Sequence, residues 1–324
     1  LQFRAQAVGL AGVVQRRRAA YAAARHDHLR AVALVRRTGD LGLEELRSVA
    51  GTDLLFGRYE EALGVATAML RCTPPDAPPA VRLFVLGLEA RARQAVGDFA
   101  GARASSERRL AIAGGLDPLS RTEAVEAAHA QLGAIALSEG DLDRAEAHLA
   151  HTGDHHVDRT RAARLALEQG AVDRALTRVG DALAKLDALG SPPGRPVEYA
   201  LAASLRIEAL VRRDGGRAAL RPAVETLRVA ASTGFPPAAL HVLLPSAWIL
   251  EGAGHPSGPA LRARVATHSA AEADLRIRAE RTPPPVAGTA PRPQELQELL
   301  DAAAAALAVA DGSRPRPIRP TRRR

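Results

Sequence analysis

The chain has 324 residues, of which 47% are hydrophobic, and its formal net charge is +8. This length allows about two globular domains or one continuous repeat array, and the absence of any run of about 18 apolar residues argues against a membrane-spanning helix. One cysteine, Cys72, excludes an internal disulfide framework and a cysteine-based zinc site. Because no signal-peptide pattern is present either, we expect a cytoplasmic chain.

Small side chains dominate the composition. Seventy residues are alanine, nine are Phe, Tyr or Trp, and Lys185 is the one basic residue that is not arginine. Burial must then come from small and aliphatic side chains at short helix-to-helix distances, which favours helices over strands. We expect Cys72 to be buried or half-buried near a helix end. The Ala/Arg bias indicates a very GC-rich bacterium, and Leu1 in place of an initiator methionine suggests a segment of a longer protein.

Residues 1–40 are the first predicted unit. Apolar residues at helical spacing, including Phe3, Leu10 and Val14, predict basic helices over residues 2–37 that pack on the rest of the chain. Gly39-Asp40 supplies a helix stop followed by a cap.

Residues 41–190 contain a repeated turn motif, in which a glycine is followed two residues later by an apolar residue and five later by an alanine. The glycines are Gly57, Gly97, Gly140 and Gly170. Glycine can adopt the left-handed conformation that ends a helix, Asp98 or Asp141 can cap the next one, and alanine lets two helices cross closely. The motif predicts consecutive helical hairpins, the first from about Leu41 to Thr73.

These units resemble the tetratricopeptide repeat (TPR), a helix-turn-helix of about 34 residues. The family's turn glycine, apolar or aromatic residue, small residue and terminating proline are matched by Gly57, Tyr59, Ala62 and Pro74. Successive turn glycines lie 40, 43 and 30 residues apart. We attribute this irregular period to loop insertions at 73–79 and 114–118 and to a shortened second helix around 145–151.

Helical patterns continue beyond a turn-rich connector at 191–196. Residues 191–281 are predicted to form further degenerate hairpins, with helices at 197–213, 217–233, 237–251 and 258–281. A Pro-rich linker is expected at 282–293, a C-terminal helix at 294–310, and a disordered Arg/Pro tail at 311–324. The whole pattern predicts an all-α fold, a TPR-like right-handed alpha-alpha superhelix (alpha-solenoid) of about five to seven hairpins.

The resemblance implies a peptide-binding groove lined by the first helix of each hairpin. By register, the groove residues are Glu44, Arg47, Leu54, Phe84, Arg91, Gln94, Leu137, Ser138, Thr160, Arg164 and Glu168. The TPR subfamily that clamps a C-terminal carboxylate needs Asn and Lys on these faces, and this chain has neither there. Arg47, Arg91 and Arg164 are either a line of carboxylate-binding side chains or ordinary solvated residues.

No catalytic or cofactor motif is present. The chain has neither a G-x-S-x-G sequence nor a phosphate loop, so we expect no enzyme and no cofactor. One cluster could hold a metal, and its candidates are His148, His151, His155 and His156. The competing interpretation is a polar loop near a helix C-terminus, where histidines are favoured.

Positive charge is concentrated at the two ends of the chain. Residues 1–38 carry +7 and residues 312–324 carry +6, which leaves −5 on residues 39–311. Nucleic acid is therefore an unlikely partner for the repeat body, although arginine-rich ends can contact phosphates.

A protein- or peptide-binding module is the function that these features favour. In composition and irregular spacing the chain resembles the C-terminal sensor solenoids of large actinobacterial transcriptional regulators, so other domains of one longer chain are possible partners. The alternative is a nucleic-acid-associated protein that uses its arginine-rich termini, and a metal-dependent enzyme at the histidine cluster is the third hypothesis.

Overall fold

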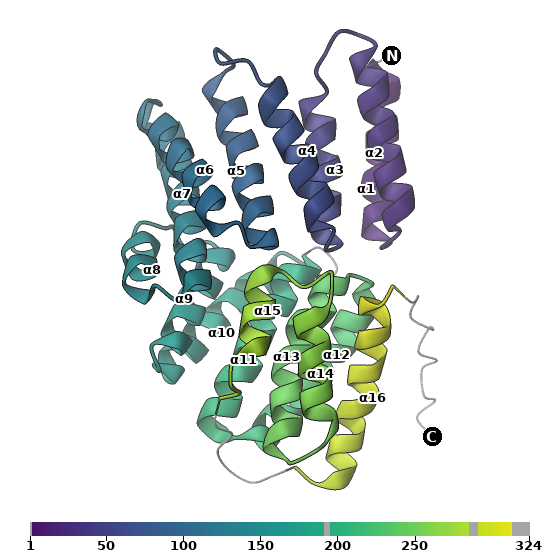
Figure 1. The fold of residues 1–324 in the computed structure, drawn as a ribbon, viewed down its shortest axis with the longest axis vertical. Helices are drawn as coiled ribbons and strands as arrows, with labels where there is room; N and C mark the ends of the chain where they lie inside the picture. Colours follow the sequence, from purple (N-terminus) through teal and green to yellow (C-terminus); the bar gives the residue numbers. More distant parts are fainter. Residues whose placement is uncertain (1, 191–194, 285–290, 313–324) are drawn as a thin grey trace.

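The structure is a computed structural model that describes residues 2–190, 195–284 and 291–312. These residues form sixteen α-helices and no strand (Figure 1). The helices are α1 (Gln2–Arg17), α2 (Tyr21–Arg36), α3 (Leu43–Leu55), α4 (Tyr59–Cys72), α5 (Pro79–Val96), α6 (Phe99–Gly114), α7 (Pro118–Glu139), α8 (Leu142–Leu149), α9 (His156–Glu168), α10 (Val172–Ala188), α11 (Pro196–Asp214), α12 (Gly216–Thr233), α13 (Pro236–Gly252), α14 (Ser257–Thr267), α15 (Ala273–Glu280) and α16 (Pro293–Ala310).

The first fourteen helices form consecutive hairpins in which each helix packs against the next one in the chain. Helix α16 packs against α12 and α13 rather than standing apart. This arrangement confirms the predicted all-α solenoid. Residues 191–194 of the predicted connector at 191–196, residues 285–290 of the predicted linker and the predicted tail from residue 313 lie outside the described residues.

The repeated turn motif has the predicted local structure. Its four glycines all have positive φ, between 74° and 96°. The carboxylate of Asp98 accepts a hydrogen bond from the Gly101 amide at 2.9 Å, and that of Asp141 accepts one from the Arg144 amide at 3.0 Å. The alanines that complete the motif are fully buried, as close helix crossing requires. They are Ala62, Ala102, Ala145 and Ala175.

Three local predictions are wrong. Cys72 is the last residue of α4 and is exposed, although Met69 one turn earlier is buried. Asp40 accepts a hydrogen bond from the Gly42 amide in a turn, and Gly42 itself precedes α3 without a side-chain cap. The predicted helix at 258–281 is two helices, α14 and α15, separated by residues 268–272.

The largest core lies in the C-terminal half around α13. Every residue of α13 from Pro237 to Leu250 is buried, so this helix is covered on all sides. Its neighbours α11, α12 and α16 supply most of the other apolar side chains of this core. None of the described helices has the length and hydropathy of a membrane span.

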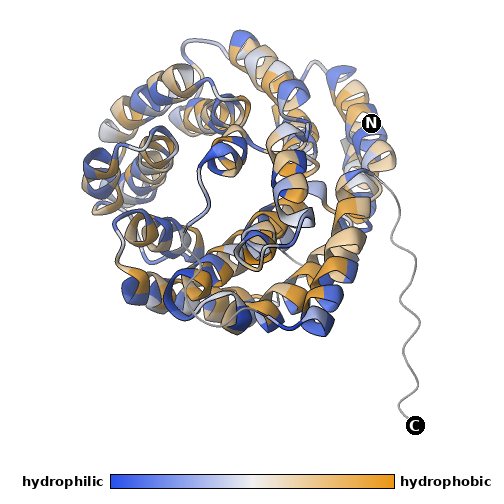
Figure 2. Cartoon of the chain, turned by 60° about the horizontal axis from the view of Figure 1, so that its bottom comes forward, coloured by the Kyte–Doolittle hydropathy of each residue, from blue (hydrophilic) through white to orange (hydrophobic). Residues whose placement is uncertain are grey.

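The path of the hairpins curves until early and late turns meet (Figure 2). The ring of Phe56, at the end of α3, lies 5.3 Å from that of Tyr21 and 4.9 Å from that of Phe235, which precedes α13. A Cβ placed on Gly234 would be 2.6 Å from that of Ala19 in the turn of the first hairpin. These contacts hold the N-terminal hairpins against the C-terminal core.

Candidate functional site

A segment from the C-terminal half packs against helices from the middle of the chain. This segment, residues 268–281, is called here the α15 segment. It leaves α14 through a turn in which His268 Nδ1 accepts a hydrogen bond from the Ala270 amide at 3.1 Å. Glu272 is extended, with φ −59° and ψ 151°, and the chain then forms α15. The helices closest to α15 are its neighbour α14 and the distant α5.

The first part of the α15 segment contacts the turn of the first TPR-like unit. The Tyr59 hydroxyl donates a buried hydrogen bond to the Ala270 carbonyl at 3.1 Å. A Cβ placed on Gly57 would lie 2.5 Å from the Ala270 Cβ, so only glycine fits this approach. Gly57 is therefore required both for its positive φ of 74° and for this contact.

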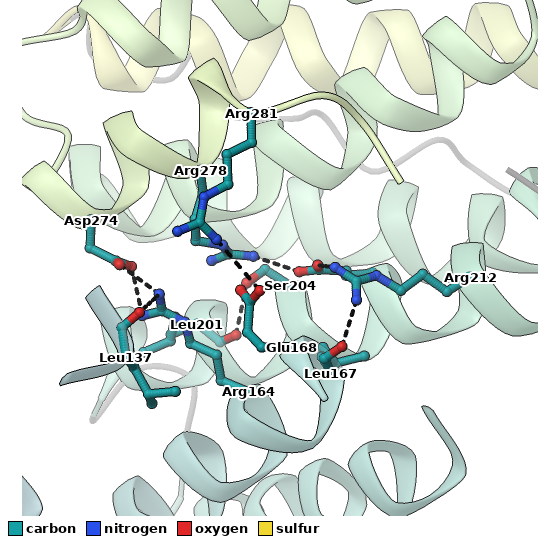
Figure 3. Close-up of polar contacts among 11 residues, drawn as sticks. Leu137, Arg164, Leu167, Glu168, Leu201, Ser204, Arg212, Asp274, Arg278 and Arg281 are labelled. Atoms are coloured by element: carbon teal, nitrogen blue, oxygen red, sulfur yellow. Dashed lines mark hydrogen bonds and ion pairs between the residues drawn. The ribbon is translucent and has the colours of Figure 1, made fainter. Parts of the chain in front are cut away.

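Arg164 of α9 binds Asp274 of α15 through two hydrogen bonds, of 2.6 and 2.8 Å (Figure 3). The guanidinium also donates to the Leu137 carbonyl at 3.3 Å, so α7 helps to orient it. Burial alone would raise the pKa of Asp274, but Arg164 and the nearby Arg278 outweigh it and the pKa is lowered. Asp274 is therefore a carboxylate that the arginines keep ionised.

Arg278 of α15 pairs with Glu208 of α11 in the interior. Their side chains are only 6% and 3% exposed. The second oxygen of Glu208 accepts from Arg212, which also donates to the Leu167 carbonyl at 2.7 Å (Figure 3). Burial would lower the pKa of Arg278, but Glu208 and Asp274 outweigh it and the pKa is raised. Each charge thus depends on the others, because an isolated buried ion is strongly unfavourable.

The end of the α15 segment makes a more exposed ion pair. Arg281 lies 3.4 Å from the carboxylate of Glu168, four residues after Arg164 on α9. Arg262 of α14 donates to the Ala279 carbonyl at 3.0 Å and ties the segment to its own half of the chain.

His241 of α13 is close enough to Arg278, Asp274 and Arg164 for their charges to act on it. Its side chain is buried and its Nδ1 has no hydrogen-bond partner. Burial, with a contribution from Arg278, lowers the pKa of His241 to about 4. Glu272 at the start of α15 has a raised pKa, because burial outweighs the attraction of Arg91.

The partners of the charged α15 side chains come from the first helices of successive hairpins. Arg164 and Glu168 are on α9, and Glu208 is on α11. The face that these first helices turn toward the α15 segment is called the inner surface. It combines a cationic position near Asp274 with anionic positions near Arg278 and Arg281, which suits recognition of a charged helix.

The sequence-predicted groove residues of the first two units remain outside the α15 contacts of Figure 3. Glu44 and Arg47 are exposed and form an ion pair, and Arg47 lies 5.6 Å from the ring centre of Phe84. Arg91 is exposed on α5. Leu54 is buried in the core between the first units.

The predicted residues of the middle units are largely buried. Gln94 donates to the Ser138 hydroxyl at 3.2 Å and accepts from Gln131 at 2.5 Å. Thr160 is 4% exposed, and its hydroxyl donates to the His156 carbonyl at 2.8 Å. Leu137 is buried as well, although its carbonyl faces Arg164.

Sequence reasoning missed the other half of the site. Asp274, Arg278 and Arg281 fall in the stretch whose many arginines and low apolar content distinguish it from the hairpins. That composition is the signal that could have identified a charged segment packed on charged partners.

The predicted histidine cluster divides into two groups. The Nδ1 atoms of His148 and His129 are 3.0 Å apart, and the His151 ring centre is 4.6 Å from that of His129. His155 and His156 stack separately, with ring centres 3.9 Å apart. Within the described ranges, no group of three or more His, Cys, Asp or Glu side chains has a geometry that could hold a metal ion.

An open hollow of about 610 Å³ lies between α8, α9 and α10, away from the inner surface. Its charged residues neutralise one another, since Arg159 pairs with both Asp154 and Asp181. Lys185 also pairs with Asp154. These residues therefore give the hollow no excess of positive or negative charge that could attract a ligand.

Comparison with known proteins finds a similar chain among the solved structures. No protein-family model matches the chain, and no curated protein matches it. Among solved structures, the chain is similar to the TPR2AB domain in the pHSP90 complex of yeast Sti1, with 14% identity over 86% of this chain and 99% of that chain. The TM-score of this similarity is 0.29.

Proposed function

We propose that this chain is a non-catalytic protein-binding module that takes up a peptide or helix on its inner surface. The observation that carries the proposal is the α15 segment itself. Side chains of α9 and α11 bind it through Arg164, Glu168 and Glu208, so this surface has the chemistry to hold a helical segment. Polar and charged groups of this kind fix the register of a bound segment.

Helix α5 also contacts α15, and the side chains of α3 and α5 that remain exposed are the part of the surface open to a partner. Arg47 and Arg91 are exposed, and Phe84 lies half-buried beside Arg47. Arginine and aromatic residues are enriched among the residues that contribute most to protein interfaces. We propose that a peptide with acidic and apolar side chains binds here, with Glu44, Gln94 and the buried Ser138 at the edges of its path.

The biological setting is part of the same proposal. The Ala/Arg-rich composition and the irregular repeat support a sensor or scaffold role within a cytoplasmic bacterial regulatory protein, of the kind found in actinobacterial transcriptional regulators. Arg164 and Glu168 would then belong to the surface through which the array senses either a protein or another domain of the same longer chain.

Selection from a displayed library of random 16-residue peptides tests the proposed function. We expect the selected peptides to bind the Phe84→Ala and Arg91→Ala variants at least tenfold more weakly than they bind the unchanged chain. The matched control is Arg108→Ala, which changes an exposed arginine on α6, the second helix of the same hairpin. Failure to select any binder, or equal loss with Arg108→Ala, would contradict the proposal.

A further inference from the structure

The part of the inner surface formed by α9 and α11 is already filled by the chain itself. We propose that the α15 segment is an intramolecular ligand, and that the partner of this region presents a short helix with a carboxylate and, four residues later, an arginine, followed by a second arginine in the extended residues just beyond the helix. The inference rests on the proposed function and adds to it the class of partner and the means of regulation.

The spacing comes from the residues that bind the inner surface. Asp274, Arg278 and Arg281 meet Arg164, Glu208 and Glu168, respectively. Asp274 and Arg278 are four positions apart on α15 and so lie on one side of the helix, whereas Arg281 follows the helix with φ −67° and ψ 156°. A partner with a helix of this length and an extended residue after it can present all three charges together. The charges define both the direction and the register of the bound helix.

Charge balance explains why the inner surface needs such an occupant. The side chains of Arg164 and Glu208 are 12% and 3% exposed while α15 is in place. If an occupant of different charge replaced α15, Arg164 would lose its carboxylate partner and Glu208 would keep only its pair with Arg212. A partner with the same order of acid and bases restores every pair, which excludes most other helices.

The attachment of α15 is suited to release. The helix has eight residues, too few to be stable alone in water. The segment contacts the earlier helices through ion pairs, a hydrogen bond and the close packing of Ala270 and Ala273 on Gly57 and Gly97, whereas Leu275 and Ala279 bury its apolar side in the C-terminal core. Removal of the charged contacts should therefore weaken the hold of the inner surface on α15.

Tethering explains why a free peptide of the same sequence would compete poorly. A segment on a short connection has an effective concentration on the order of millimolar at its own site. A partner at micromolar concentration must therefore bind more tightly than α15, or first engage the open surface around Phe84 and Arg91. In the second case, binding of the partner at α5 would promote release of α15 from α9.

A labelled peptide of residues 268–284 tests the proposal on the full-length chain by fluorescence anisotropy. The Asp274→Ala/Arg278→Ala double variant keeps the partners on α9 and α11 but removes two anchors of α15. We expect it to bind the peptide at least tenfold more tightly than the unchanged chain. Addition of Arg164→Ala should abolish that gain, and a peptide with Asp274→Arg and Arg278→Glu should not bind.

Equal affinity of the unchanged chain and the folded double variant would overturn the proposal. If circular dichroism shows that the double variant is unfolded, the peptide affinity of the isosteric variant Asp274→Asn is measured instead. A tightening of threefold or more with Asp274→Asn supports the proposal, and an unchanged affinity overturns it. The two proposals can fail separately. If only the inference about α15 is wrong, displayed peptides should still bind at Phe84 and Arg91. If the proposed function is wrong, that binding should be absent.

Discussion

Arg164 and Asp274 lie 110 positions apart in the sequence and are joined by two hydrogen bonds, of 2.6 and 2.8 Å. The pair links the first helix of a TPR-like hairpin to a short helix of the C-terminal half. The charged interior around it gives this solenoid an inner surface that already holds a helix.

We expect loss of either member of this pair to destabilise the fold. Arg164→Ala leaves the largely buried carboxylate of Asp274 without its main partner, which should lower the free energy of unfolding by about 3 kcal/mol. In a double-mutant cycle with Asp274→Ala, the combined loss should be smaller than the sum by about 1 kcal/mol or more. Urea unfolding measures both values.

The matched control for this prediction is Arg221→Ala. Arg221 pairs with Glu225 on the surface, with side chains 88% and 59% exposed. Solvent screens such a pair, so we expect no measurable change in stability. An equal effect of Arg164→Ala and Arg221→Ala would show that the interior pair has no special role.

Two turn glycines provide a second test. Gly57 and Gly170 have nearly the same φ, 74° and 76°. In Gly170→Ala the new Cβ has no other atom within 4 Å, so the free energy of unfolding should fall only by the left-handed backbone strain of alanine, about 1 kcal/mol. Alanine at Gly57 would also meet Ala270 at 2.5 Å and should cost about 1–3 kcal/mol more. Thermal unfolding of the two variants checks the difference, and equal losses would contradict the contact.

Local features of the fold could be predicted from the sequence because their causes are local. Gly97 and Gly140 end helices through their own backbone freedom, and Asp98 and Asp141 cap the helices that follow them. The exposed position of Cys72 could not be predicted in this way, since it depends on how the end of α4 packs against other helices and not on the local sequence.

The candidate site was only partly predictable for the same reason. Register identified Arg164 and Glu168 as residues of a first helix, but no local pattern indicates that Asp274 and Arg281 lie opposite them. Those contacts depend on the curvature of the whole array and on the break between α14 and α15. The same curvature leaves Thr160 buried although its register suggested a groove position.

Acid should destabilise the protein through His241. Its pKa is lowered to about 4 by burial and by Arg278, against an ordinary value near 6.5. A lowered histidine pKa contributes stability that is complete above about pH 6.5 and is lost as the pH falls toward 4. The full loss from this one group is about 3 kcal/mol.

Urea unfolding at a series of pH values checks this contribution. His241→Leu has nothing to titrate at this position, so its free energy of unfolding should fall less steeply than that of the unchanged chain between pH 6.5 and 4.5. Asp274, Arg164 and Arg278 are the charged groups that act on His241, and all three are kept in this comparison. Parallel pH curves for the two proteins would contradict the assignment.

The exposed thiol of Cys72 gives a simple check on the end of α4. We expect a thiol reagent to modify Cys72 in the folded chain without denaturant, because its side chain is exposed. Cys72→Ser should change the free energy of unfolding by less than about 0.5 kcal/mol. Reaction only after addition of denaturant would contradict this position.

Hydrogen exchange of the unchanged chain, with and without millimolar unlabelled peptide of residues 268–284, tests most directly whether the inner surface is a binding surface held by α15. We predict faster exchange of the amides at 273–280 when the peptide is present, while the fully buried α13 keeps its protection. Unchanged exchange at 273–280, or equal loss of protection across α13, would contradict this account.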